Sequence, residues 1–220
     1  MIIDHAGLAL FPDIGLFRCI GRLSFPIYCF LLVQGYRHTR NVASYGRRLA
    51  LLAVVSEIPF DLLIFARRAS AMEQNVLFSL LLALIALSIT DTLREKPLHA
   101  SAAVLLLCLC SMSLNVSYGW LGVALCLCMH NTATNKVQFT LGVSGVLLLY
   151  SLTLRLSGVT HSWVLVSLCA QFSLIPLLCY NGKPGLRHPA LTALFYAAYP
   201  LHIIVLLILR AMRIVPPHFF

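Results

Sequence analysis

The stretch that decides the fold is GRLSFPIYCFLLVQGYRHTR, residues 21–40, in which an apolar run passes into a dense basic segment. This pattern is typical of a membrane helix that leaves the lipid at a charged loop. The run also contains Arg22, whose charge lipid disfavours, and Pro26, which cannot donate a helical hydrogen bond. A bilayer tolerates both when neighbouring helices satisfy them, so the stretch predicts a helical bundle with a polar interior.

Composition extends this interpretation to the whole chain. Of the 220 residues, 60% are hydrophobic and 10% are charged, whereas about 25% are charged in a typical soluble domain. A membrane span needs about 20 apolar residues. Polar breaks leave a partial helix at 1–11 and spans at 16–36, 46–66, 74–93, 98–114, 118–130, 137–155, 162–180 and 190–210.

We therefore expect an all-α polytopic transmembrane helix bundle of about eight to nine membrane segments. Residues 1–220 are expected to form one integral-membrane domain, because the polar breaks are too short to hold a soluble one. The run at 1–11 is too short to span, so either it forms a half-helix or the first helix is truncated and starts upstream.

The net charge of +9 is explained by membrane topology rather than by nucleic-acid binding, because the basic residues lie in short loops. One side carries Arg37, Arg40, Arg47, Arg48, Arg94, Lys96, Lys136, Lys183 and Arg187. The opposite side carries Arg18, Arg67, Arg68, Arg155, Arg210 and Arg213. The excess predicts that the loop at 37–48 is cytoplasmic and that the C-terminus is external.

The eight cysteines lie inside apolar runs, where a free cysteine packs as a small hydrophobic residue. The sequence has no CxxC motif and no cysteine and histidine spacing typical of zinc. We therefore expect no metal site.

Near the start, Asp4 places a carboxylate beside the imidazole of His5. A carboxylate can fix an imidazole tautomer and stabilise the charged ring, as a general base or a nucleophile requires. Adjacent helical residues point in different directions, so Asp4 pairs either with His5 or with Arg22. Arg22 in turn either faces the bundle interior or extends to the external surface. All three are catalytic candidates.

Glu57 and Asp61 lie on one helix face, four residues apart, with Pro59 between them. Two such acids can share a proton, hold a cation or pair with an arginine such as Arg22 or Arg47. The arginine pairing is favoured, because an unpaired carboxylate in the bundle costs several kcal/mol. Glu57 is therefore a further catalytic candidate.

His202 follows Pro200 in the middle of the last span. A single histidine on an apolar face is usually a satisfied core residue. Lipid, however, supplies no water to satisfy it, so a partner inside the bundle is required. His202 is therefore also a catalytic candidate.

The basic loop is denser than topology alone requires, with Arg37, Arg40, Arg47 and Arg48. Guanidinium groups bind phosphate oxygens, so these arginines suit a phosphorylated cytosolic ligand. Asn75 and Tyr118 are weaker candidates for substrate binding, because each lies at a segment end where helix capping or an interfacial position explains it. No glycine-rich nucleotide loop is present.

In their order and spacing, several motifs resemble the TraX family, named for the conjugation protein that N-acetylates the pilin subunit. They are IDH (3–5), GRLSFP (21–26), QGYRHTRN (34–41), SEIPF (56–60), QNVLF (74–78), SYG (117–119), YNGK (180–183) and FYAAYPLH (195–202). Ser117 and Gln34 stand where acids are common in similar chains, and Ser117 is therefore given no catalytic role.

The resemblance implies a relative of multi-helix membrane acyltransferases, which pass an acyl group from cytosolic coenzyme A to an acceptor at or across the membrane. Such enzymes carry a histidine in the first membrane helix, which His5 matches, and an earlier basic residue, whose position would precede Met1. The resemblance therefore implies a protein of the bacterial inner membrane that uses acetyl-CoA. The acceptor would be a pilin or other peptide N-terminus, or a sugar.

Transfer to an amine suits the candidate residues. An α-amino group has a pKa of about 8 and must lose a proton before it attacks a thioester, so His5 is the expected base. An acylated His5 with His202 as base is the alternative. Arg22 or Asn75 is expected to stabilise the oxyanion.

Two other functions remain open. A proton-coupled small-molecule transporter would use the acids and histidines as a relay and the prolines as helix breaks, although no inverted repeat is found. A membrane assembly factor would keep the fold without the chemistry.

Overall fold

The computed structural model describes residues 1–12, 14–65, 73–182 and 189–212, and this part of the chain contains helices and no β-strand. The elements are α1 (Ile2–Ala9), α2 (Gly15–Arg22), α3 (Ser24–His38), α4 (Val42–Phe65), α5 (Val76–Thr92), α6 (Pro97–Ser113), α7 (Leu121–Thr132), α8 (Lys136–Leu156), α9 (His161–Leu168), the 3-10 helix η1 (Cys169–Ser173), α10 (Leu174–Leu178) and α11 (Pro189–Ala211). The predicted all-α transmembrane bundle is confirmed.

The helices follow the predicted spans closely. α2 and α3 run into each other at Leu23, and α9, η1 and α10 form one continuous segment. Within the described residues, four segments are long and apolar enough to cross a membrane: Gly15–His38, Lys136–Leu156, His161–Leu178 and Leu194–Ala211. The helices α5, α6 and α7 are apolar but shorter. The chain is a multi-pass membrane protein, and the partial helix expected at its start is α1.

Local sequence explains where several helices begin and end. The side-chain oxygen of Asn75 accepts a hydrogen bond from the backbone N–H of Leu77 at the start of α5, and Asn135 caps α8 in the same way. α6 begins with Pro97 in its first turn, where a missing backbone N–H costs nothing. α8 ends before Gly158, which has a φ of 79° that favours glycine.

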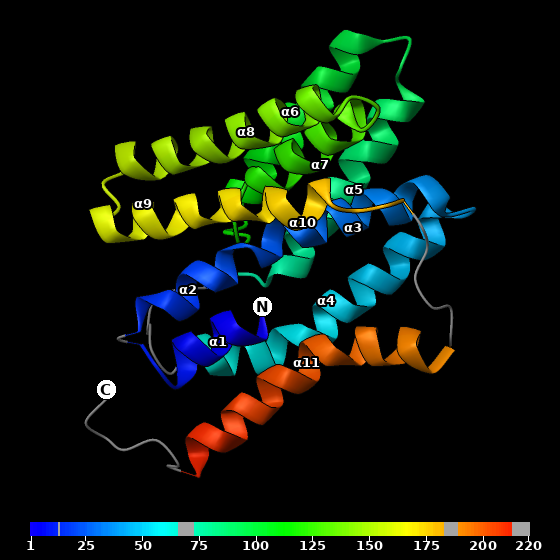
Figure 1. Cartoon of the computed structure of the whole chain (residues 1–220). Helices are drawn as coiled ribbons and strands as arrows, with labels where there is room; N and C mark the ends of the chain where they lie inside the picture. Colours follow the sequence, from blue (N-terminus) through cyan, green and yellow to red (C-terminus); the bar gives the residue numbers. More distant parts are fainter. Residues whose placement is uncertain (13, 66–72, 183–188, 213–220) are drawn as a thin grey trace.

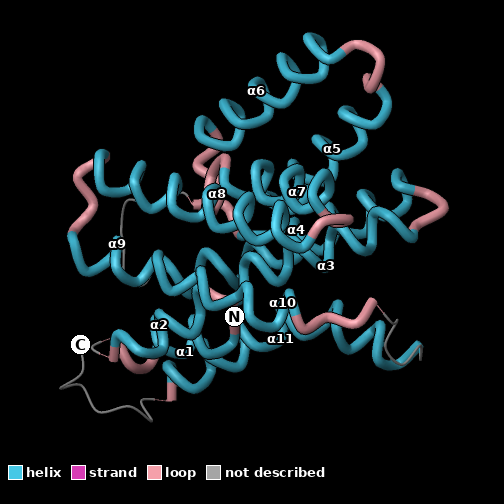
Figure 2. Tube along the Cα trace, turned by 45° about the horizontal axis from the view of Figure 1, so that its top comes forward, coloured by secondary structure: helices cyan, strands magenta, loops and turns pink. Residues whose placement is uncertain are grey.

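The helices pack in two connected groups (Figure 1). α4 lies alongside α11, and α1 contacts both α11 and α2. α7 packs between α5 and α8, and α3 connects these helices to α2. α6 packs mainly against α5 and extends to one side of the bundle, as Figure 2 shows.

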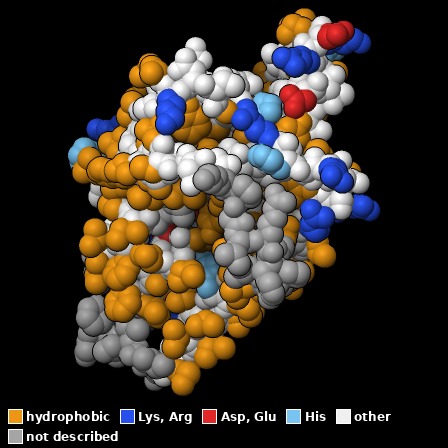
Figure 3. Space-filling model, turned by 45° about the vertical axis from the view of Figure 1, so that its right-hand side comes forward, with side chains coloured by type: hydrophobic (Ala, Val, Ile, Leu, Met, Phe, Trp, Pro, Cys, Tyr) orange, Lys and Arg blue, Asp and Glu red, His pale blue; other side chains and the backbone are white. Residues whose placement is uncertain are grey.

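The outer surface is that of a protein in lipid. Large apolar side chains are exposed on most helices, including Leu98 at 79%, Ile58 at 71% and Leu141 at 69%. Soluble proteins rarely expose contiguous apolar patches of this kind. Figure 3 shows an extensive hydrophobic surface, with many of the charged side chains gathered toward one end of the molecule. Of the basic residues assigned to the loops, Arg67, Arg68, Lys183, Arg187 and Arg213 lie outside the described residues.

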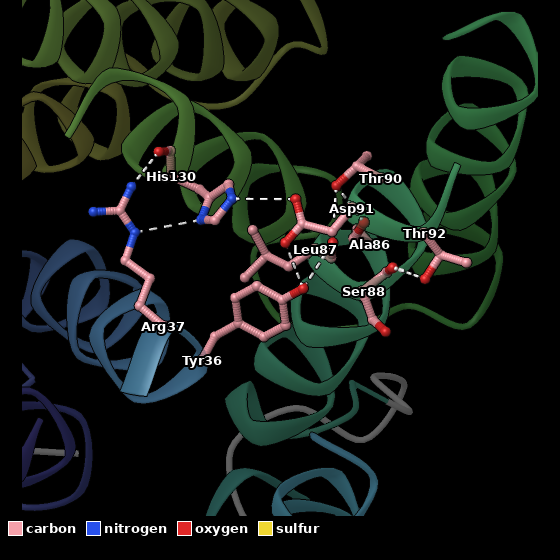
Figure 4. A network of polar contacts seen from close by, with 9 residues as sticks. All are labelled: Tyr36, Arg37, Ala86, Leu87, Ser88, Thr90, Asp91, Thr92 and His130. Carbon is pink, nitrogen blue, oxygen red and sulfur yellow. Dashed lines mark hydrogen bonds and ion pairs between the residues drawn. The ribbon is translucent and has the colours of Figure 1, made fainter. Parts of the chain in front are cut away.

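The end of the bundle that carries Arg37, Arg40, Arg47 and Arg48 is referred to as the arginine end. There, polar side chains connect the ends of three helices (Figure 4). Tyr36 of α3 donates a hydrogen bond of 2.7 Å from its hydroxyl to Oδ2 of Asp91 on α5. His130 of α7 lies 3.4 Å from the other oxygen of that carboxylate. These contacts place the loops after α3, α5 and α7 on the same side of the membrane.

Candidate active site

A cavity of about 380 Å³ lies at the end of the bundle away from this polar cluster. Its walls come mainly from α1, α2, α3, α8 and α9, with further residues from α4, α11 and the loops that precede α5, α7 and α9. The polar and aromatic lining residues are Asp4, His5, Arg18, Arg22, Ser24, Phe25, Phe60, Glu73, Ser117, Tyr118, Tyr150, Trp163, Ser167 and Tyr199. We refer to this cavity as the chamber.

Two glycines allow α1 and α2 to lie close enough to form one wall of the chamber. A Cβ atom on Gly7 would lie 2.5 Å from the Cβ of Phe17, and one on Gly21 would overlap the Asp4 side chain. Real Cβ atoms do not approach other heavy atoms this closely. The glycines therefore permit the packing that holds Asp4 against α2.

Asp4 forms an ion pair with Arg18, whose Nη1 lies 2.7 Å from Oδ1 of the carboxylate. Nη1 also donates a hydrogen bond of 3.2 Å to the backbone oxygen of Asp4. The sequence predicted that Asp4 would pair with His5 or Arg22, and the structure instead gives it Arg18. Arg18 lies one turn before Arg22 on α2, so it reaches the adjacent Asp4 directly.

His5 and His202 bring the first and last helices together. Nδ1 of His5 lies 2.8 Å from Nε2 of His202, and the two rings are parallel to within 9°. The other nitrogen of His202, Nδ1, lies 2.7 Å from the backbone oxygen of Ala198. His5 is 8% exposed and lines the chamber. The partner that His202 was expected to need inside the bundle is therefore His5.

Arg22 faces the chamber rather than the lipid. Its Nη1 donates a hydrogen bond of 3.0 Å to the hydroxyl of Tyr118, and its guanidinium lies 5.5 Å from the centre of that ring. Trp163 provides a second aromatic face at 5.8 Å. Cation-π contacts of this kind keep an arginine favourable in a poorly hydrated space. Of the two positions open to Arg22, the structure gives the interior one.

Tyr118 lies in the loop between α6 and α7, with a φ of 65° that non-glycine residues rarely adopt. Its ring stacks on Phe25, with centres 4.0 Å apart, and this contact fixes the strained residue. Burial raises the pKa of the Tyr118 hydroxyl, although Arg22 acts in the opposite direction. The hydroxyl therefore stays protonated at neutral pH and accepts from Arg22 while retaining its own proton for a ligand.

Glu57 and Asn75 do not line the chamber but bond to each other behind it. The Asn75 amide nitrogen donates to Oε2 of Glu57 and, at 2.8 Å, to the backbone oxygen of Ala53. The expected pairing of Glu57 with Arg22 or Arg47 is absent from the described ion pairs: Oε2 of Glu57 accepts from Asn75, and Oε1 is buried without a described hydrogen-bond partner. The catalytic role of Glu57 and the binding role of Asn75 stay predictions.

All four arginines of the basic loop are exposed at the other end of α3, around the turn into α4. Arg37 donates a hydrogen bond of 2.5 Å to the backbone oxygen of His130, as Figure 4 shows, and Arg48 donates to the Ser44 hydroxyl at 3.1 Å. No bond of this kind is found among the described contacts of Arg40 and Arg47. Arg22 and Arg37 are 15 positions apart, or about 20 Å along a helix.

Several chamber residues were not predicted from the sequence. Arg18 was assigned to an external loop, and Trp163 and Tyr150 resembled the aromatic residues common in membrane helices. Glu73 lies in the chamber wall, where its Oε1 accepts a hydrogen bond of 2.9 Å from the Ser117 hydroxyl. The SYG motif was the one available signal, because it marked the loop that carries Ser117 and Tyr118.

No metal site is found among the described residues, where no group of three or more histidine, cysteine and acidic side chains is placed to hold an ion. The chemistry of the chamber is that of an imidazole beside two guanidinium groups, two carboxylates and three phenols.

Comparison with known proteins adds to this geometry. The sequence profile of the family described as TraX protein matches residues 1–210. The chain is 34% identical over 223 aligned residues to "Probable fimbrial assembly protein FimC, serogroup H1" of Dichelobacter nodosus. That alignment covers 94% of this chain and 89% of the relative. No solved structure is significantly similar to the chain.

Proposed function

Because the chain belongs to the TraX family, we propose that it is an integral-membrane acyltransferase. It transfers an acetyl group from cytosolic acetyl-CoA to an amino or hydroxyl group of a membrane-associated or extracytoplasmic acceptor. The observation that carries the proposal is His5, an imidazole in the chamber wall that is hydrogen-bonded to His202 at 2.8 Å. The chamber itself provides a partly buried space in which an imidazole can act as base.

His5 takes the proton of the attacking amine, whose nitrogen forms a bond to the acetyl carbon. The bond between that carbon and the thioester sulfur breaks, and the thiolate leaves with the proton that His5 then returns. Arg22 and the Tyr118 hydroxyl are the donors available for the oxyanion formed in between. Asp4 balances the charge of Arg18, whereas the guanidinium of Arg22 has no carboxylate partner among the described ion pairs.

The acyl donor would bind from the arginine end. Arg40 and Arg47 are exposed and suit the phosphates of coenzyme A, with Arg37 and Arg48 beside them. The chamber volume of about 380 Å³ suits an acetyl group and its thioester with part of the acceptor, whereas the nucleotide would remain outside. The excess of basic residues supports a cytoplasmic position for this loop and an external C-terminus, in the bacterial inner membrane.

The acceptor would enter from the other end, because the chamber walls include the loops before α5, α7 and α9. The relative in Dichelobacter nodosus is named as a fimbrial assembly protein, which supports the N-terminus of a pilin subunit as the acceptor. Another peptide N-terminus or a sugar is the alternative, and no nucleic acid is expected as a partner.

The test is acetyl transfer in membranes that contain the chain, with labelled acetyl-CoA and a pilin acceptor. We expect His5→Ala to abolish labelling. His99→Ala, which changes an exposed histidine on α6, is the matched control and should leave labelling unchanged. If His5→Ala labels the acceptor as well as the wild type does, His5 is not the catalytic base.

Two other functions predict different results. A non-catalytic assembly factor, which the relative's name also suits, would show no transfer or hydrolysis of acetyl-CoA by the wild type, while its loss would still impair pilus assembly. A proton-coupled carrier would instead show proton-dependent uptake into vesicles.

A further inference from the structure

The hydrogen bonds around His202 determine which nitrogens of the two histidines carry protons. The Ala198 carbonyl can only accept a hydrogen bond, so Nδ1 of His202, 2.7 Å away, must carry a proton. A neutral imidazole has one N–H, so Nε2 of His202 must accept. Its neighbour at 2.8 Å, Nδ1 of His5, is then the donor. The lone pair of neutral His5 is therefore on Nε2.

The geometry of the pair agrees with this assignment. The N–H of an imidazole and its lone pair both lie in the ring plane, and the two planes are parallel to within 9°. The ring centres are 5.0 Å apart, much farther than the joined nitrogens. The rings therefore meet edge to edge, as an N–H···N hydrogen bond requires.

Asp4 does not take this role, because its carboxylate is paired with Arg18 at 2.7 Å. The usual device of a carboxylate that orients a histidine is thus replaced by a second histidine. Both nitrogens of His202 are engaged, which leaves it no lone pair for a substrate. Nε2 of His5 has no hydrogen-bond partner among the described residues, and His5 lines the chamber.

We infer that His202 is a positioning residue, which holds His5 in the tautomer whose Nε2 lone pair faces the acceptor. The positioning role of His202 in catalysis rests on the proposed function, whereas the assignment of the His5 tautomer does not. His202 accepts from His5 in the resting state and stabilises the imidazolium that forms when Nε2 takes a proton. His5 is then the group that meets the acceptor, and His202 is not an alternative base.

The test compares two variants. In His202→Gln the side-chain oxygen can still accept from Nδ1 of His5, whereas His202→Leu fills similar space without an acceptor. Nitrogen NMR of histidine-labelled protein in nanodiscs, at about pH 8 where an ordinary imidazole is neutral, reports the tautomer. The His5 signal is assigned by its loss in His5→Gln.

We expect Nδ1 of His5 to be protonated in the wild type and in His202→Gln, and the Nε2–H tautomer to appear in His202→Leu. We also expect kcat to fall about 100-fold in His202→Leu and only a few-fold in His202→Gln, with KM for acetyl-CoA unchanged. A wild-type His5 protonated at Nε2, or a tautomer unchanged in His202→Leu, would overturn the inference. The expected tautomers in a protein without transfer activity would support the assignment and reject the proposed function.

Discussion

Asp4 on α1 and Arg18 on α2 form an ion pair of 2.7 Å whose two side chains are only 12% and 14% exposed. The same guanidinium donates to the Asp4 backbone oxygen, so Arg18 joins two helices through both side chain and main chain. This pair holds the wall of the chamber that carries His5.

Removing one partner should destabilise the protein strongly. We expect Arg18→Met to cost about 3 kcal/mol of unfolding free energy, because it leaves the Asp4 carboxylate buried without a counter-charge. The double variant Asp4→Asn, Arg18→Met should recover part of that loss. Thermal unfolding in detergent measures both, and Arg155→Met at an exposed site is the control. Equal unfolding temperatures for Arg18→Met and Arg155→Met would show that the pair contributes nothing.

Gly21→Ala should separate α1 from α2, because the added methyl group would overlap the Asp4 side chain. We expect a lower unfolding temperature and the loss of acetyl transfer together. Gly145→Ala on α8 is the matched control, because no atom lies within 4 Å of its added Cβ, and alanine stabilises a helix interior by about 0.5–1 kcal/mol relative to glycine. A Gly21→Ala protein as stable and active as Gly145→Ala would contradict the close packing of these helices.

The helices were predictable because each apolar run is long enough to form one and the polar breaks between runs are short. The need of His202 for a partner inside the bundle followed from the same logic, since a polar group in lipid must be satisfied by neighbouring helices. Which partner each group takes was not predictable. Asp4 pairs with Arg18 because two glycines bring α1 onto α2, and a sequence pattern gives no such distance.

The contacts that the aromatic residues of the chamber make could not be predicted from the sequence either. Trp163 looks like any interfacial tryptophan until α9 is placed beside α2, where its ring lies 5.2 Å from the Arg18 guanidinium. Tyr118 needs a left-handed backbone and a stacking partner in Phe25 to reach Arg22. Glu57 was expected to pair with an arginine because an unpaired buried carboxylate is costly, whereas the amide of Asn75 donates to one of its oxygens and the other is buried without a described hydrogen-bond partner.

Asn75 should matter more for stability than an ordinary helix cap. Its amide caps α5 and also donates to the Ala53 carbonyl and to Glu57, all in a fully buried position. We expect Asn75→Ala to cost about 3 kcal/mol, the sum of a lost cap and of buried groups left unpaired. Asn135→Ala, an exposed cap of α8, should cost only about 1 kcal/mol. Similar losses in the two unfolding measurements would argue against the buried network.

The Tyr118 hydroxyl should affect transfer as well as stability. Tyr118→Phe keeps the stack on Phe25 but removes the oxygen that Arg22 reaches at 3.0 Å. We expect kcat to fall about tenfold or more, since a hydrogen bond to a charged group contributes about 1.5–3 kcal/mol. Tyr150→Phe removes a second hydroxyl from the same chamber and is the control. An unchanged kcat in Tyr118→Phe would place the oxyanion donors elsewhere.

The exposed arginines at the other end of α3 should affect donor binding alone. We expect Arg40→Gln with Arg47→Gln to raise KM for acetyl-CoA about tenfold or more and to leave kcat nearly unchanged, because both side chains lie far from His5 and make contacts equal in ground and transition states. Arg94→Gln, an exposed arginine at the same end, controls for lost positive charge. Steady-state kinetics at fixed acceptor concentration separate the two constants. A fall in kcat at constant KM would instead place these arginines in the chemical step, which their position at the far end of a helix about 20 Å long argues against.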